Sequence, residues 1–281
     1  MTAPAPSPTS PAATRALIAL LETRTGQQLA AYRSWRLDIA LKPLLKERGL
    51  TTLDQLVALI AGGADTGLAD RIVDGLVNSE SSFFRDAAVF DLALDVVSHA
   101  ESEGQRARIW SAGCSTGQEP LSLAMLLAER KAKATPAAPE IVATDVSETA
   151  LARARAGRYT QFEVQRGLPI RRLLQWFDQV QDDWTASPEL TRTIHYRASN
   201  LVADAPPPGR FDLVLCRNVL LYLAPDMKAR VFASLAAALR PDGLLILGAG
   251  ETVIGQTPLF EPSRRYRGLY DRVPEAAARA A

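Results

Sequence analysis

The stretch Ser-Ala-Gly-Cys-Ser-Thr-Gly-Gln-Glu-Pro at residues 111–120 connects a short apolar segment to one whose apolar residues have helical spacing. Gly113 and Gly117 allow the backbone to turn sharply and to approach a ligand closely. Free N–H groups at the start of the following helix point toward such a ligand. Glu119 lies in this first turn, where it is placed to pair with an ammonium group. The stretch predicts a ligand-binding strand–helix turn, with an ordinary glycine-containing turn as the alternative.

Apolar runs of strand length alternate with helical segments on both sides of this turn. The expected strands cover residues 108–111, 140–144, 193–198, 211–216 and 244–248, and the expected helices cover residues 120–130, 148–156 and 226–239. This alternation predicts an α/β fold in which crossover helices connect a mostly parallel sheet. Ligands of such sheets bind at the carboxyl ends of the strands, so we expect functional residues directly after strands.

The first part of the chain has helical patterns only. The expected helices, at residues 13–22, 27–47, 53–61 and 68–77, predict a small helical bundle. The Pro-, Ser- and Thr-rich start resembles neither a secretory signal nor a packed segment. We therefore expect a disordered leader at residues 1–11, a helical domain at residues 12–76 and an α/β domain at residues 77–281.

The composition excludes several classes of protein. A formal net charge of +1 over 281 residues argues against a general nucleic-acid binder. Two cysteines without a CxxC spacing argue against a zinc site and against a disulfide framework, which fits the cytoplasm. No apolar run reaches the length of a membrane span. The two histidines leave few candidates for a histidine base.

Polar residues follow three of the expected strands. Asp145 is placed to accept the ribose hydroxyls of a nucleoside cofactor, or alternatively to cap the next helix in competition with Ser147. The pair Asn200-Leu201 suits the edge and face of an adenine, or is a plain loop. The charge in Arg217-Asn218 needs a partner, which is either an anionic ligand or an internal carboxylate.

The segment at residues 79–86, Ser-Glu-Ser-Ser-Phe-Phe-Arg-Asp, links the two expected domains. The Phe83-Phe84 pair is expected to anchor this link in the core and so to hold Arg85 in a fixed direction. The alternative is a linker that packs through its aromatic rings and leaves Arg85 solvated.

Six segments together resemble the CheR family of chemotaxis receptor methyltransferases. They lie at residues 81–86, 110–125, 143–145, 166–169, 217–222 and 250–252. The resemblance covers essentially the whole chain after the leader. It implies a Rossmann-like class I S-adenosylmethionine-dependent methyltransferase domain after a small helical bundle, and an enzyme that methylates glutamate carboxylates on chemoreceptors.

The resemblance also implies roles for individual residues. With the turn glycine, the cofactor S-adenosyl-L-methionine is expected to contact Ser79, Ser81, Arg85, Gly113, Glu119, Asp145, Asn200, Leu201, Arg217 and Asn218. Arg85 and Tyr222 are expected to position the reacting groups. Ser79 stands where the family commonly has Asn, and Ser81 where Thr is usual; the neighbouring Asn78 is a candidate to compensate for the first change.

The expected substrate is the acidic methylation helix of a receptor. In the family the helix that corresponds to residues 27–47 recognises it, and here that helix carries Arg33, Arg36, Lys42 and Lys46. A solvated helix face is the alternative. Residues 176–196 lie where some relatives have an antiparallel insert that binds a receptor tail, and the sequence leaves that role open.

Neither nucleic-acid binding nor membrane insertion is expected, and the chain is expected to be a monomer. A regulatory module that binds the cofactor with weak or no catalysis remains an alternative because of Ser79. A nucleotide-dependent oxidoreductase is disfavoured, because the Gly-x-x-x-Gly spacing of the turn differs from the dinucleotide fingerprint Gly-x-Gly-x-x-Gly.

Overall fold

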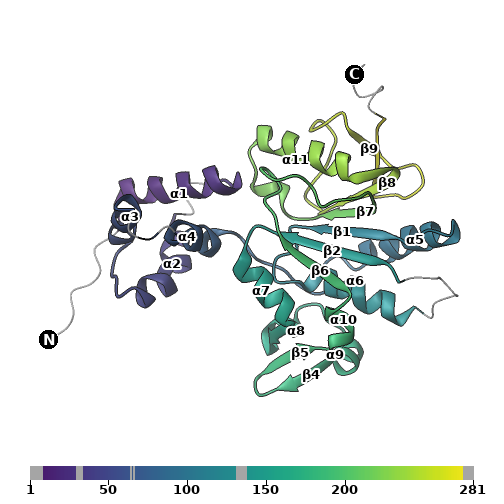
Figure 1. Cartoon of the computed structure of the whole chain (residues 1–281), viewed down its shortest axis with the longest axis horizontal. Helices are drawn as coiled ribbons and strands as arrows, with labels where there is room; N and C mark the ends of the chain where they lie inside the picture. The colour runs from purple at the N-terminus through teal and green to yellow at the C-terminus, as the bar shows by residue number, and fades with distance from the viewer. Residues whose placement is uncertain (1–8, 30–33, 64, 66, 131–137, 275–281) are drawn as a thin grey trace. The chain divides into compact units, whose positions relative to one another are not determined.

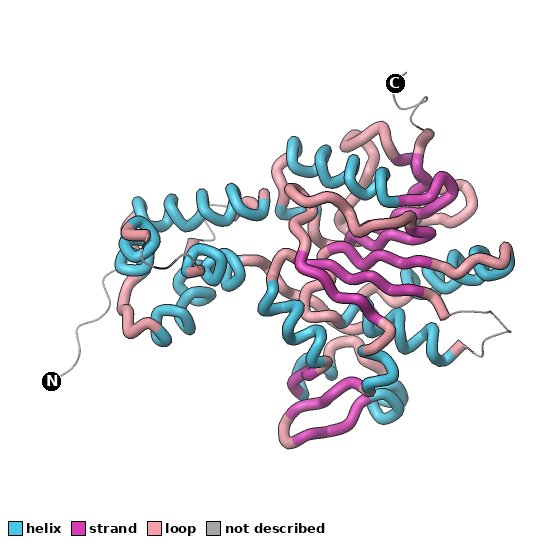
Figure 2. Tube along the Cα trace, viewed as in Figure 1, coloured by secondary structure: helices cyan, strands magenta, loops and turns pink. Residues whose placement is uncertain are grey.

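The computed structural model describes residues 9–29, 34–63, 65, 67–130 and 138–274. The chain divides into two units, Met1–Asn78 with Tyr222–Ala224, and Ser79–Leu221 with Pro225–Ala281. Figure 1 and Figure 2 show the helices of the first unit and the mixed sheet of the second. In the described part of the chain, no helix combines the length and the apolar character that crossing a bilayer requires.

Among its described residues, the first unit contains four helices with a shared leucine-rich core. They are α1 Pro11–Thr25, α2 Trp35–Glu47, α3 Leu53–Ala61 and α4 Leu68–Leu76. Leu17, Leu41 and Leu56 are fully buried. Thr52 caps α3 and forms a capping box with Gln55, as its position before an apolar run predicts.

Two helix boundaries differ from the predictions. The helix α1 begins at Pro11, inside the expected leader, because Ser10 accepts a hydrogen bond from the Ala13 N–H and proline suits the first helical position. The predicted start of α2 at residue 27 is wrong. Gly26 ends α1 in a left-handed conformation, and Gln27 then pairs in extended form with Leu223 of the same unit.

The second unit is built on a seven-stranded sheet with the order β6-β2-β1-β7-β8-β10-β9. Its strands are β1 Arg108–Ala112, β2 Glu140–Asp145, β6 Ile194–Ala198, β7 Phe211–Cys216, β8 Leu239–Leu247, β9 Phe260–Pro262 and β10 Tyr270–Arg272. The five strands from β6 to β8 pair in parallel, whereas β10 and β9 are antiparallel. The predicted α/β fold with a mostly parallel sheet is confirmed.

Helices pack against this sheet and bring its carboxyl ends to one edge. They are α5 Ala88–Ser102, α6 Gln118–Glu129, α7 Glu148–Ala156 and α11 Pro225–Ala238. All six residues of β7 are buried, as expected for a strand covered on both faces. The strand β8 begins at Leu239, five residues before the prediction, because Leu239 pairs with Phe211 before an irregularity in the ladder.

A second, three-stranded antiparallel sheet with the order β3-β5-β4 lies between β2 and β6 in the sequence. Its strands are β3 Arg158–Thr160, β4 Phe177–Val180 and β5 Asp183–Ala186, and the short helices beside it are α8 Gln161–Gln165, α9 Ile170–Trp176 and α10 Pro188–Thr191. The strand predicted at residues 193–198 is β6 of the main sheet, so no strand of this second sheet was predicted. The structure adds an antiparallel sheet in this region (Figure 2).

Candidate functional site

The turn between β1 and α6 requires glycine at both predicted positions. Gly113 has φ +81° and Gly117 has φ +91°, in the left-handed region that favours glycine. A Cβ on Gly113 would lie 2.4 Å from Val219 Cγ2, and one on Gly117 would lie 2.8 Å from Ala154 Cβ. Both glycines therefore serve backbone conformation and close packing, and the predicted strand–turn–helix geometry is confirmed.

Asp145, at the end of β2, holds this turn. Its carboxylate accepts hydrogen bonds from the Ser115 N–H at 2.7 Å and from the Ser147 N–H at 2.9 Å. Ser147 caps α7 by accepting from the Ala150 N–H, so the helix-cap alternative for Asp145 is wrong. The buried carboxylate is thus fixed against the backbone of the turn, on the edge where a ligand of this sheet binds.

Arg217, at the end of β7, has an internal set of partners. Its side chain is 2% exposed, and its guanidinium donates to Glu119 Oε2 at 3.0 Å and to Asp86 Oδ2 at 2.6 Å. It also donates to the Arg85 carbonyl at 2.7 Å. The structure therefore shows the internal alternative: two carboxylates compensate the buried charge. A further contact with an anionic ligand stays a prediction.

Two groups of this cluster, the Glu119 carboxylate and the Arg217 Nε–H, are relevant to ligand binding. Glu119 also accepts from Ser111 Oγ at 2.8 Å, so its carboxylate is oriented from two sides. The Nε–H of Arg217 is buried and has no hydrogen-bond partner in the described part of the chain. A buried charged donor without a partner is costly, which makes it a point where a ligand oxygen gains binding energy.

Glu251 was missed as a site residue, although its segment was part of the resemblance. One oxygen accepts from the N–H groups of Asn218 at 2.7 Å and Gly248 at 2.8 Å. The other accepts from Leu220 at 2.8 Å and Leu221 at 3.3 Å. This carboxylate holds the loop after β7, including Asn218 with its φ of +59°. Its position just after β8, at the same edge, was the signal that could have found it.

The segment at residues 79–86 is anchored by its two phenylalanines, as predicted. Phe83 is fully buried and meets Tyr159 edge-on, with 5.0 Å between ring centroids. The Arg172 guanidinium lies 4.7 Å from the Phe84 ring centroid. Arg85 itself is exposed, while its carbonyl is tied to Arg217.

The backbone around Arg85 is strained on both sides. Phe84 has φ +47° and Asp86 has φ +56°, values that are uncommon for residues with a side chain. The Phe84 N–H donates to Ser122 Oγ at 3.0 Å, and Asp86 pairs with Arg217. Such strain persists only where surrounding contacts determine it, and it is concentrated at functional sites.

Gly167 packs closely against the backbone of the segment at residues 79–86. It has φ +87°, and a Cβ there would lie 2.1 Å from the Phe83 carbonyl oxygen. Arg166 forms an ion pair with Glu80 at 2.8 Å. The segment at residues 166–169, which carried part of the resemblance, thus contacts the backbone of the linker directly.

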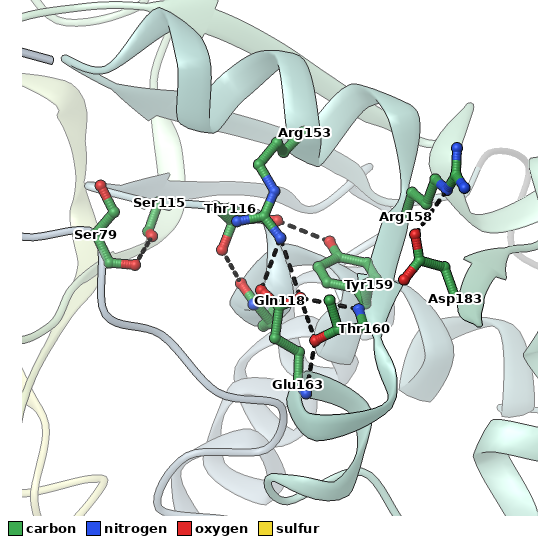
Figure 3. A network of polar contacts seen from close by, with 10 residues as sticks. All are labelled: Ser79, Ser115, Thr116, Gln118, Arg153, Arg158, Tyr159, Thr160, Glu163 and Asp183. Atoms are coloured by element: carbon green, nitrogen blue, oxygen red, sulfur yellow. Dashed lines mark hydrogen bonds and ion pairs between the residues drawn. The ribbon is translucent and has the colours of Figure 1, made fainter. Parts of the chain in front are cut away.

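Ser79 reaches the turn through its backbone (Figure 3). Its carbonyl accepts from Ser115 Oγ at 2.6 Å, and the neighbouring Thr116 carbonyl accepts from the buried Tyr159 hydroxyl at 2.7 Å. The contact from Ser79 does not depend on its side chain, so the exchange of Asn for Ser leaves it intact. Ser81 is half-buried in the same segment.

Asn200 and Leu201 lie in the loop after β6 and are half-buried. The Asn200 amide oxygen accepts from the Val202 N–H at 3.0 Å, and its backbone N–H donates to Asp204. The Ser199 N–H donates to the Asp145 carbonyl at 2.9 Å, which places this loop beside the end of β2.

Tyr222 belongs to the first unit, and Arg85 to the second. Tyr222 ends the 3₁₀ helix η2 Leu220–Tyr222, and its hydroxyl accepts a hydrogen bond from the Asn78 side-chain amide. The Gln28 N–H donates to its carbonyl at 2.7 Å. Asn78, the candidate to compensate for Ser79, therefore contacts Tyr222.

Of the four predicted basic residues for receptor binding, three lie on α2. Lys42 and Lys46 are exposed and Arg36 is half-buried. Arg33 lies outside the described residues.

Burial keeps the thiols near the sheet edge protonated. It raises the pKa of Cys114 and of Cys216, and the carboxylates of Asp145 and Glu251, respectively, add to the effect. Both thiols are therefore neutral at neutral pH, whereas a nucleophilic cysteine must be a thiolate. The groups that remain at this edge are carboxylates, guanidinium groups and backbone donors, which can bind and orient a charged ligand.

Comparisons with known proteins identify the family. Residues 79–268 match the model of the family "CheR methyltransferase, SAM binding domain". Chemotaxis protein methyltransferase 1 of Vibrio cholerae is 34% identical over 253 residues, which cover 89% of this chain and 92% of that protein. Chemotaxis protein methyltransferase 1 of Pseudomonas aeruginosa is 35% identical over 240 residues, which cover 83% and 87%.

Among solved structures, the glycopeptide N-methyltransferase MtfA complexed with S-adenosylmethionine matches at 17% identity and a TM-score of 0.34, over 54% of this chain and 48% of that one. The family match spans the turn, the linker and the carboxyl ends of the five parallel strands. The chain belongs to the CheR methyltransferase family, and residues 79–268 are its S-adenosylmethionine-binding domain.

Proposed function

We propose that this enzyme transfers the methyl group of S-adenosylmethionine to glutamate side chains on the cytoplasmic helices of chemoreceptors, as a protein-glutamate O-methyltransferase. The chain is an S-adenosylmethionine-dependent methyltransferase of chemotaxis signalling. The observation that carries the proposal is the joint fixation of the turn, the linker and the loop after β7 by Asp145, Arg217 and Glu251. With such a substrate the enzyme works in the cytoplasm, and we propose that it does so as a monomer.

The residues at the sheet edge fit this cofactor. The Nε–H of Arg217, unpartnered among the described residues, suits the cofactor's carboxylate, and Glu119 suits its ammonium group. Asp145 suits the ribose hydroxyls, and Asn200-Leu201 suits the adenine. At Gly113 the absence of a side chain allows the backbone to approach the cofactor closely. The remaining proposed cofactor contacts are Ser79, Ser81, Arg85 and Asn218.

Methyl transfer to a carboxylate depends on alignment of the reacting groups more than on proton transfer. When bound, S-adenosylmethionine supplies an electrophilic methyl group on a sulfonium. A glutamate acceptor with a pKa of about 4.3 is already ionised at neutral pH, so no general base is needed. The chain's task is to orient that carboxylate and to remove its water. We assign the orientation to Arg85 and to the hydroxyl of Tyr222, as positioning groups that move no proton.

Receptor binding is assigned to the helical unit. Lys42 and Lys46, with Arg36 and Arg33, would attract an acidic receptor helix, although Asp38 and Glu47 reduce the basic character of this face. Charge complementarity of this kind acts mainly on association rate and specificity. Reversal of the charges at Arg33 and Arg36 is expected to weaken receptor methylation.

The experiment that tests the proposal measures the transfer of radiolabelled methyl groups from S-adenosylmethionine to receptor-containing membranes. It compares the turnover of the Arg85→Ala variant with that of the wild-type enzyme. Because the Arg85 carbonyl, not its side chain, binds Arg217, the variant keeps this link and should fold. Loss of a positioning group is expected to lower turnover about 100-fold. Arg264→Ala, which removes another exposed arginine of the domain, should retain wild-type turnover. Near-normal turnover of Arg85→Ala would refute its assignment.

A further inference from the structure

A hollow of about 140 Å³ opens at the carboxyl edge of the sheet, next to the loop that Glu251 holds. Its wall combines the start of η2, the helix α11 and the segment after β8, all within the second unit. Its volume is similar to the roughly 150 Å³ of cavities that hold a benzene molecule, so it has room for a side chain. None of the proposed cofactor contacts lines it.

One side of the hollow is apolar and accessible. Leu221 is 48% exposed, and its Cδ2 lies 3.7 Å from the position of a Cβ built on Gly250. Leu221 therefore covers the bare backbone of Gly250, while the buried Phe232 and Leu220 line the same hollow. An exposed leucine on a flat surface needs no explanation, but here it borders a hollow with a buried apolar wall.

The other side carries a positive charge. Lys228 is half-buried on α11, and it forms no ion pair with any described residue. It lies four residues into the helix, near the positive end of the helix dipole, where a cation lowers helix stability. Helix stability therefore does not account for a lysine at this position.

Among the described residues, the carboxylate in the wall is that of Glu251, and it is already engaged. Both of its oxygens accept backbone N–H groups, four in all, and no ion pair between Glu251 and Lys228 is formed among the described residues. Asp226, in the first turn of α11, is exposed and does not line the hollow. The hollow thus offers a cation and an apolar surface to a partner.

We propose that this hollow binds the substrate helix beside the glutamate that is methylated, with a flanking carboxylate of that helix near Lys228 and a flanking apolar side chain against Leu221. The inference rests on the proposed function, which supplies an acidic helix as the partner. Glu251 binds both Asn218 of the proposed cofactor contacts and Leu221 of the hollow. Because Glu251 holds both, a substrate bound in the hollow has a fixed position relative to the loop after β7.

The test compares Lys228→Glu with Arg230→Glu, which makes the same charge change on an exposed residue of the same helix. The substrate is a purified cytoplasmic fragment of a chemoreceptor from the same organism. Because a like charge would now face the flanking carboxylate, KM for the fragment should rise about tenfold in Lys228→Glu, with kcat and the Kd for S-adenosylmethionine unchanged. Leu221→Ala should also raise KM for the fragment. A receptor fragment whose flanking glutamate is changed to lysine should restore the KM of Lys228→Glu.

The outcomes separate this inference from the function on which it rests. Equal KM values for Lys228→Glu and Arg230→Glu, with a wild-type enzyme that methylates the fragment, would overturn the hollow as a substrate site and leave the proposed function intact. A wild-type enzyme that binds S-adenosylmethionine but methylates no receptor fragment would overturn both.

Discussion

At the residue scale, the charged groups around Arg217 set the net charge of the candidate site. With Asp86 and Glu119 it forms a cluster of one cation and two anions, which leaves one formal negative charge beside the linker. S-adenosylmethionine carries a sulfonium, an ammonium and a carboxylate, and so has one net positive charge. In the proposed complex the formal charges of cluster and cofactor compensate each other, and the Arg217 Nε–H would donate to the one anionic group of the ligand.

Gly167 provides the sharpest test of a single position. In Gly167→Ala the new methyl group would meet the Phe83 carbonyl oxygen at 2.1 Å, and backbone cannot move aside as a side-chain tip can. Left-handed strain and overpacking together are expected to lower the free energy of unfolding by about 3 kcal/mol. Cofactor affinity should fall as well, because Phe83 anchors the segment that holds Arg85. Denaturant unfolding and calorimetry measure the two effects.

Gly104→Ala is the matched control. Gly104 has φ +72°, but a Cβ there would meet nothing within 4 Å. This variant should therefore lose only the conformational contribution, about 1 kcal/mol, and should bind S-adenosylmethionine normally. Equal losses of stability in the two variants would show that the contact with Phe83 has no special role.

The site residues that the sequence revealed are those that interrupt a strong local pattern. Asp145 ends the apolar strand β2 and Arg217 directly follows the apolar strand β7, so a charge at either position stands out. Two other carboxylates at this edge did not stand out. Asp86, which pairs with Arg217, and Glu251, which holds Asn218, lie in loops, where a carboxylate is ordinary, and only the fold brings them to the strand ends. The internal pairing of Arg217 could not be decided from the sequence for the same reason.

An ion pair joins the helices α6 and α9, and it predicts a pH dependence of stability. Arg172 on α9 donates to Glu129 on α6 at 2.8 Å, and Trp176 donates to the same carboxylate at 3.1 Å. The hydrogen bond from Arg172, followed by that from Trp176, lowers the pKa of Glu129 from its ordinary value of 4.5, against the opposing effect of burial. The pair therefore stabilises the fold above pH 4.5, and its contribution is lost as the pH falls through the lowered pKa.

Glu129→Gln should accordingly cost about 1 kcal/mol of unfolding free energy at pH 7, a modest value because the pair is partly exposed. The difference from wild type should shrink toward zero in strongly acidic solution, below pH 4.5. Glu261→Gln, an exposed position on β9, should show no such difference at either pH. A pH-independent gap between wild type and Glu129→Gln in chemical unfolding would exclude the ion pair as its cause.

Elements differed in how well they could be predicted. The buried parallel strands are marked by apolar runs, such as Phe211–Cys216, and they were expected at nearly the right places. The edge strand β6, Ile194–Ala198, was also expected, although only Ile194 is buried. The strands β3, β4 and β5 are three or four residues long and mostly exposed or half-buried, so their sequence has no strong periodicity. The helix α5, which follows the linker, was not predicted, although its buried residues have helical spacing.

The chain has two units, and the proposed roles fall on both of them. The Rossmann-like class I S-adenosylmethionine-dependent methyltransferase domain implied by the resemblance is confirmed by the family match and by the mostly parallel seven-stranded sheet. The helical unit includes Tyr222 through its contacts with Asn78 and Gln28, although Tyr222 lies within the sequence of the other unit. A proposed positioning residue thus belongs, by its contacts, to the unit with the proposed receptor-binding helix.

The central claim is that the acceptor is a glutamate carboxylate of a chemoreceptor. The most direct measurement incubates the wild-type enzyme with methyl-labelled S-adenosylmethionine and a receptor cytoplasmic fragment, then treats one portion of the product with mild alkali and maps another by mass spectrometry. In a portion mapped without alkali we predict label on glutamate residues of the fragment, and in a portion treated with alkali we predict its release as methanol, because a carboxylate ester is cleaved by alkali. Label that survives alkali, or a fragment that receives none from an enzyme that binds the cofactor, would contradict the account.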